Sequence, residues 1–213
     1  DLHRRHTGIV VRDSAQFEPP ATAAGDPADP ATLYAVSDSF LAQPYIYRIN
    51  ALTVPALITE RIAVGAVESE DQTLAEDALE GIAVRPEGRF WLASEGRVSE
   101  GSSRPTLIVR AEADGTVVEG IELPAEAVEV ATNSGLEGVA VTGTEADGDE
   151  TVWVVQQRPW DNDAEGTVKV GRYDVAGGEW TFAARDGVSG QRLDAVAIVE
   201  RGKLSEEPAG RRA

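Results

Sequence analysis

The sequence predicts an all-β fold, a β-propeller of about three four-stranded blades plus the first strand of a fourth. The first observation is an internal repeat, in which Leu79–Val84 recurs as Leu136–Val141 and as Leu193–Ile198, 57 residues later each time (79 to 136, 136 to 193). The second is that each copy opens a series of short runs rich in Val, Ile, Thr, Tyr and Trp. Several short strands per repeat, separated by turn residues, are typical of propeller blades.

Each copy is expected to form the innermost strand of its blade, because an apolar run suits burial on both faces. A weaker copy, His6–Val11, is expected to open the first blade, and the Pro-, Ala- and Asp-rich segment 18–31 is expected to be a loop. The other expected strands are Thr32–Asp38, Tyr45–Ile49 and Ala56–Val64, then Arg89–Glu95, Thr106–Arg110 and Thr116–Leu123, then Thr151–Gln157, Thr167–Asp174 and Glu179–Ala184. Glu68–Ala78 and Ala125–Thr132 are each expected to hold a helical turn.

The repeats divide one domain, residues 1–213, into segments 6–76, 77–132 and 133–190, with a fourth beginning at 191–213. Propellers usually have four to eight blades, so this count predicts about half of a propeller. Two explanations stay open. Either a missing or separate segment completes the ring, or a second copy closes it as a two-fold symmetric homodimer.

Composition excludes several classes of function. The chain has 37 acidic and 19 basic residues, a net charge of −18, which argues against nucleic-acid partners and favours capture of cations. Without cysteine there is no disulfide or zinc–thiolate site, and with only His3 and His6 a histidine-based triad is not expected. No apolar run is long enough to span a membrane.

Acidic residues recur at one position of the repeat, namely Glu80, Glu137 and Asp194. Inner strands of a propeller surround a common axis, so these carboxylates are expected to form a ring at one mouth of the channel, where a calcium ion would neutralise them. Asp77 and Asn133 are placed to add ligands. Alternatively, the acids are solvated turn residues.

The order of the motifs resembles the phytase-like β-propeller family, described as "esterase-like activity of phytase". The resemblance rests on Leu33–Asp38, on Leu79–Ala83 followed by Arg85–Gly96, and on Asn133–Ala140. It implies an exported, six-bladed propeller that hydrolyses small phosphate or carboxylic esters. The sequence departs from the family in lacking the last blades and a channel histidine.

On this resemblance, a calcium-assisted hydrolase would use Asp38 or Glu95, which end the second strands, as general base. Arg97, Arg158 or Arg104, expected in loops after the second strands, would bind an anionic substrate group. The alternative is a non-catalytic binding propeller with a structural calcium at the channel mouth. A further loop, Trp160–Asp163, is interpreted as a plain turn in preference to a second calcium site.

Overall fold

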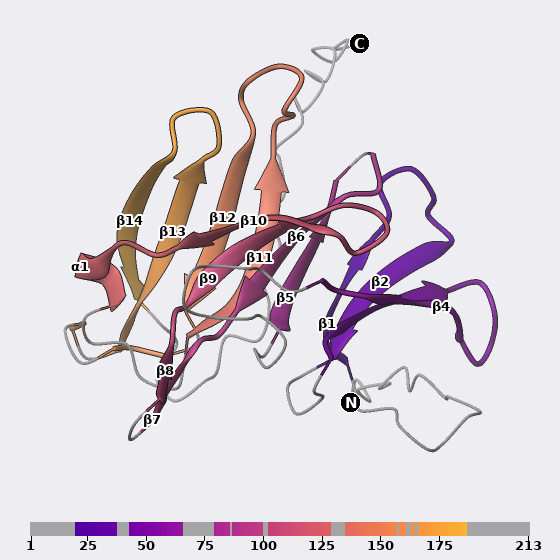
Figure 1. Ribbon diagram of the computed structural model, residues 1–213, viewed down its shortest axis with the longest axis horizontal. Coiled ribbons are helices and arrows are strands. Elements are labelled where there is room, and N and C mark those ends of the chain that lie inside the picture. Colours follow the sequence, from indigo (N-terminus) through magenta and orange to yellow (C-terminus); the bar gives the residue numbers. More distant parts are fainter. Residues whose placement is uncertain are drawn as a thin grey trace, which may run out of the picture.

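The computed structural model describes residues 20–37, 43–65, 79–85, 87–99, 102–128, 135–156, 158–160, 163–164 and 166–186 (Figure 1). Within these residues the chain forms three four-stranded antiparallel sheets, which confirms the predicted all-β, partial-propeller fold. The predicted inner strands His6–Val11 and Leu193–Ile198 lie outside the described residues.

Each sheet is one blade and falls within one sequence repeat. Blade 1 contains β1 (Pro20–Gly25), β2 (Thr32–Ser37), β3 (Tyr45–Asn50) and β4 (Leu57–Ala63). Blade 2 contains β5 (Leu79–Val84), β6 (Phe90–Ser94), β9 (Leu107–Ala111) and β10 (Val117–Glu122). Blade 3 contains β11 (Leu136–Thr142), β12 (Thr151–Gln156), β13 (Thr167–Asp174) and β14 (Glu179–Asp186).

The nine expected second, third and fourth strands are all present, with ends that differ by at most two residues from the predicted ones. A short helix, α1 (Ala125–Val128), lies within the predicted helical turn 125–132. The predicted turn at Glu68–Ala78 lies outside the described residues. Among the described residues, none of the helical structure is long and apolar enough to cross a membrane.

Two expectations about local structure were wrong. The segment 18–31 is not a loop throughout, because β1 occupies Pro20–Gly25 and pairs with β2. Its Ala-rich sequence carries no strand signal, and β1 is held by its pairing with β2 and its packing against β5. A short hairpin, β7 (Arg97–Ser99) with β8 (Ser102–Arg104), also projects where a loop was expected (Figure 1).

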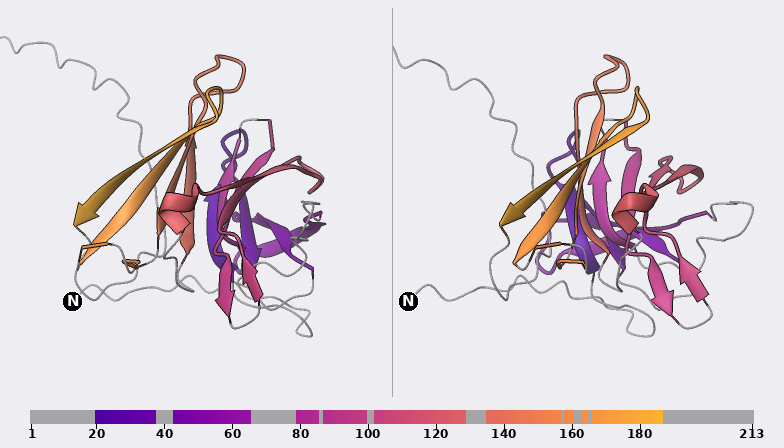
Figure 2. Two further views of the ribbon diagram at one scale, coloured as in Figure 1. Left: turned by 60° about the vertical axis from the view of Figure 1, so that its left-hand side comes forward. Right: turned by 90° about the vertical axis from the view of Figure 1, so that its left-hand side faces the viewer.

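The blades stack through their faces, with β5 packed between β1 and β11 (Figure 2). In β6, Phe90 and Leu92 pack into the core shared with blade 1, whereas Trp91 and Ala93 pack into the core shared with blade 3. All five residues of β6 are buried because the sheet is covered on both faces. A continuous apolar strand in the sequence therefore marks a blade with a neighbour on each side.

The two ends of the blades differ in their connections. We call the end at which β5 and β11 begin the mouth end, and the opposite end the turn end. At the mouth end the connections are long, spanning 38–44, 95–106 and 157–166 within blades and 64–78 and 123–135 between them. At the turn end they are hairpin connections of four to eight residues, such as 85–89, 112–116 and 143–150. Binding residues more often lie on long connections carried by a rigid scaffold, so the mouth end is the better place for a site.

Candidate functional site

Glu80 and Glu137 occupy equivalent irregularities at the mouth end of blades 2 and 3. In blade 2, Leu79 pairs with Ser94 but Gly81 pairs with Ala93, so Glu80 is an extra residue in the inner strand. In blade 3 the same shift, between Leu136 and Gly138, leaves Glu137 as the extra residue. Such β-bulges bend a strand and re-aim a side chain, and they are over-represented next to active sites.

Blade 1 has the same shift between Pro20 and Thr22, which makes Ala21 the structural equivalent of the two glutamates. The inner strand of blade 1 is therefore β1, and the prediction that His6–Val11 holds this position was wrong. The bulge of β1 carries no acid. Among the described residues, the ring of carboxylates predicted at this position includes Glu80 and Glu137 alone.

Both glutamates are almost completely buried, with 5% of Glu80 and 3% of Glu137 exposed. Their strands approach closely at Gly81, where an added Cβ would lie 3.0 Å from the backbone nitrogen of Val139. The glycine after the acid thus allows tight packing of β5 against β11. Buried carboxylates are tolerated when they are paired or bind a cation, which makes this end of the two strands chemically unusual.

Glu95, the predicted general base, follows β6 and is held through its backbone. The hydroxyl of Thr106 donates a hydrogen bond to the Glu95 carbonyl oxygen at 2.9 Å. Gly135 packs against the same carbonyl, so closely that a Cβ there would lie 1.9 Å from the oxygen. This contact joins the end of β6 to the segment entering β11, two residues before Glu137.

The structure describes only some of the remaining predicted site residues. Asp38, Asp77, Asn133 and Asp194 lie outside the described residues. Arg97 and Arg104 were expected in loops, but they lie on β7 and β8, where their backbones are paired across the hairpin. Arg158 is exposed. Within the described ranges, no three acidic or histidine side chains lie close enough to hold a metal ion.

The predicted turn at Trp160–Asp163 is built around the Asp163 carboxylate. This group accepts hydrogen bonds from the Trp160 amide at 2.7 Å and from Gln156 Nε2 at 2.6 Å, and it pairs with Lys169 at 2.5 Å. Burial raises the pKa of Asp163, but these contacts outweigh burial and lower the pKa overall. Both carboxylate oxygens of Asp163 are contacted by donors within the protein, which favours the interpretation of this segment as a plain turn over a calcium site.

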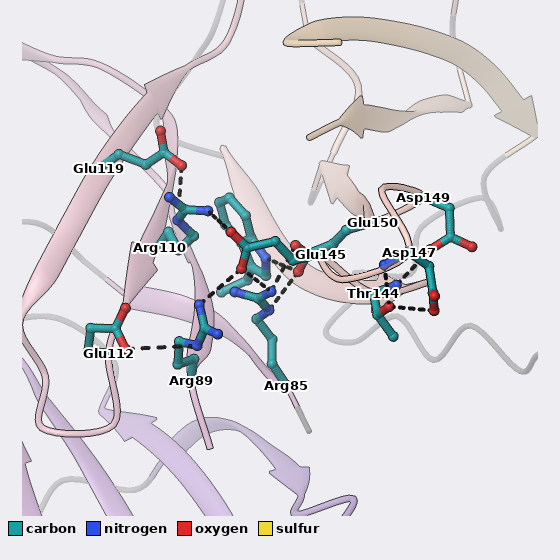
Figure 3. A network of polar contacts seen from close by, with 11 residues as sticks. Arg85, Arg89, Arg110, Glu112, Glu119, Thr144, Glu145, Asp147, Asp149 and Glu150 are labelled. Atoms are coloured by element: carbon teal, nitrogen blue, oxygen red, sulfur yellow. Dashed lines mark hydrogen bonds and ion pairs between the residues drawn. The ribbon is translucent and has the colours of Figure 1, made fainter. Parts of the chain in front are cut away.

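A polar network at the turn end was not anticipated from the sequence (Figure 3). Arg85, just after β5, pairs with Glu150, just before β12, with 2.7 Å between Arg85 Nε and Glu150 Oε1. The indole nitrogen of Trp91 donates to the same carboxylate at 3.0 Å. Arg85 and Glu150 are each 2% exposed, so this is a buried ion pair that links blade 2 to blade 3.

Glu145, in the turn between β11 and β12, extends the network to the surface. Its carboxylate lies 3.0 Å from both Arg85 Nη2 and Arg89 Nη1 and 3.6 Å from Arg110 Nη1. The hydrogen bond from Arg85 is the main reason that the pKa of Glu145 lies below its usual value. An acid immediately before β12 and an arginine immediately after β5 were the available sequence signals, but nothing in the sequence paired them.

Comparison with known proteins adds a family. The family model described as "Phytase-like: Esterase-like activity of phytase" matches residues 22–204. No curated protein matches the chain.

Proposed function

Because the chain belongs to the phytase-like family, which carries the description "esterase-like activity of phytase", we propose that it hydrolyses small phosphate or carboxylic esters with calcium bound at the mouth end. The observation that carries this proposal is the pair of buried carboxylates, Glu80 and Glu137, in equivalent bulges of adjacent inner strands.

The donor atoms fit calcium better than a transition metal. The chain has no cysteine, and carboxylate oxygens are the ligands of hard cations. Glu80 and Glu137 would supply two ligands. Since calcium takes six to eight oxygens, we propose that others come from Asp77, Asn133 and Asp194, at the same end by sequence.

In the proposed reaction the chain orients the ester and accepts a proton from the attacking water. Calcium bound at this site would polarise the phosphoryl or carbonyl oxygen. The Glu95 carboxylate, or Asp38 in blade 1, would take a proton from the attacking water as its oxygen forms a bond to phosphorus or carbon. The bond to the alcohol then breaks and the alcohol recovers a proton. Arg97, Arg104 or Arg158 would bind the anionic group of the substrate.

Hydrolysis of p-nitrophenyl phosphate, p-nitrophenyl acetate and phytate, with calcium and with EDTA, tests the proposal. The expected result is calcium-dependent turnover that is lost in Glu80→Gln and in Glu137→Gln. Glu119→Gln is the matched control, since Glu119 is an acid on the outer strand β10, 40% exposed as a side chain. Turnover that is equal in EDTA would contradict the proposal.

A second candidate is a non-catalytic binding propeller in which calcium has a structural role. The observation in its favour is the burial of both glutamates, because a cation held only by buried groups would be shielded from substrate. Thermal stabilisation by calcium without turnover of any of the three esters would support this second candidate.

We also propose that further blades complete the ring, because the described residues form three blades and propellers have four to eight. A longer polypeptide or a second copy of the chain could provide them, and the mass of the particle in solution distinguishes the two. For localisation we propose export, the usual setting that the family implies.

A further inference from the structure

Ser94, the last residue of β6, has a buried hydroxyl that no other group satisfies. The residue is 0% exposed, and its Oγ has no hydrogen-bond partner within the described part of the chain. Leaving a buried polar group unpaired costs stability, so native structures contain few such groups. A bound ion, a bound water or a functional role is the usual explanation.

The equivalent residue in blade 3 shows that the fold does not require an unpaired group here. Gln156 ends β12 and pairs with Leu136, as Ser94 pairs with Leu79. Gln156 is also buried, but its Nε2 donates to the Arg158 carbonyl and its Oε1 accepts from the Lys169 amide at 2.7 Å. Blade 3 therefore satisfies its polar group internally, whereas blade 2 does not.

The position of Ser94 ties its free hydroxyl to the mouth-end site. It lies opposite the bulge that carries Glu80 and immediately precedes Glu95, whose backbone is fixed by Thr106 and Gly135. We propose that the Ser94 hydroxyl is an oxygen ligand of the calcium bound at this site, an inference that rests on the proposed function. A neutral oxygen raises the ligand count of the proposed site without adding charge to its carboxylates.

Calcium titration of the full chain by isothermal calorimetry, with thermal melts in EDTA and in calcium, tests this inference. Ser94→Ala is expected to weaken calcium binding about tenfold. The same variant is expected to melt in EDTA at the wild-type temperature or above it, because an unsatisfied buried group has been removed. Ser94→Cys, which keeps the volume but offers a soft sulfur, should weaken binding as well.

Thr151→Val is the matched control. Thr151 is also buried, but it lies at the turn end and its hydroxyl donates to the Asp149 carbonyl at 3.3 Å. Its loss should lower the melting temperature and leave calcium affinity unchanged.

The outcomes separate the two proposals. If the wild type binds calcium, Glu80→Gln abolishes binding and Ser94→Ala has no effect on affinity, the role of Ser94 is overturned and the calcium site stands. If the wild type binds no calcium, the calcium site fails and the role of Ser94 fails with it. A tenfold loss in the Ser94 variants, with binding abolished in Glu80→Gln and affinity unchanged in Thr151→Val, supports both.

Discussion

The two ends of the blades contain different kinds of buried polar group. At the turn end, Arg85, Glu150 and Trp91 form a buried network of an ion pair and hydrogen bonds that joins blades 2 and 3, although Arg85 Nη1 has no hydrogen-bond partner in the described part of the chain. At the mouth end, Glu80 and Glu137 lie buried in bulges of adjacent inner strands, and the buried Ser94 hydroxyl, opposite the Glu80 bulge, has no hydrogen-bond partner among the described residues. The same strands run through both ends, so the difference lies in the chemistry and not in the scaffold. One end joins the two blades through a buried ion pair, and we propose that the other binds a ligand.

The turn end gives the largest predicted effect. Glu150→Gln removes the buried charge opposite Arg85, which is 2% exposed and would keep only the more exposed Glu145 as its ionic partner. Breaking one partner of a buried pair typically costs about 3–5 kcal/mol. We expect a loss of this size in the free energy of unfolding, measured by urea denaturation.

Arg89→Gln is the control for that prediction. Arg89 belongs to the same network, but its side chain is 28% exposed, and exposed ion pairs contribute less than about 1 kcal/mol. If Glu150→Gln and Arg89→Gln lowered stability equally, the turn end would not act as a buried link between blades.

The mouth end should show the next largest effect, and only when calcium is present. At a calcium concentration 100-fold above its dissociation constant, binding to the folded state adds about 2.7 kcal/mol of stability. We expect this gain to vanish in Glu80→Gln and to persist in Glu119→Gln. Urea denaturation in EDTA and in calcium measures it, and an undiminished gain in Glu80→Gln would place the calcium elsewhere.

A smaller effect is expected where the segment before β11 crosses Glu95. Gly135→Ala would put a methyl group 1.9 Å from the Glu95 carbonyl oxygen, so the backbone must shift. Overpacking of this kind costs about 1–3 kcal/mol, and the shift should also reduce turnover. Gly25→Ala is the control, because nothing lies within 4 Å of a Cβ at that residue. Equal stability of both variants, by urea denaturation, would remove the evidence for a close contact at Glu95.

The two ends also differ in how far the sequence alone could predict them. The recurrence of Glu80 and Glu137 marked the mouth end, because the repeat places both acids at one position. Their bulges were not visible, since a register shift depends on which residue lies across the strand. Nor was β1, whose Ala-rich sequence has one threonine as its β-branched residue and no large apolar side chain. The turn end was missed because Arg85 and Glu150 are 65 residues apart and belong to different repeats.

The smallest predicted effect concerns Asp163, a satisfied polar group that lies at the mouth end of blade 3. Its pKa is lowered in the folded state, so its contribution to stability is present above the unfolded pKa of about 3.9 and is lost as the pH falls through the lower folded value. Asp163→Asn should therefore lower stability by about 1 kcal/mol at pH 7, a typical net contribution of a hydrogen bond, and the difference from wild type should shrink below about pH 4. Urea midpoints at pH 7, 5 and 3.5 test this, and Lys169→Gln should show the same trend because it removes the charge that Asp163 pairs with. A deficit that does not change with pH would mean that the hydrogen bonds, and not the charge, hold this turn. A clear pH dependence would show that the mouth end contains a structural ion pair in blade 3 beside the ligand site proposed for blade 2.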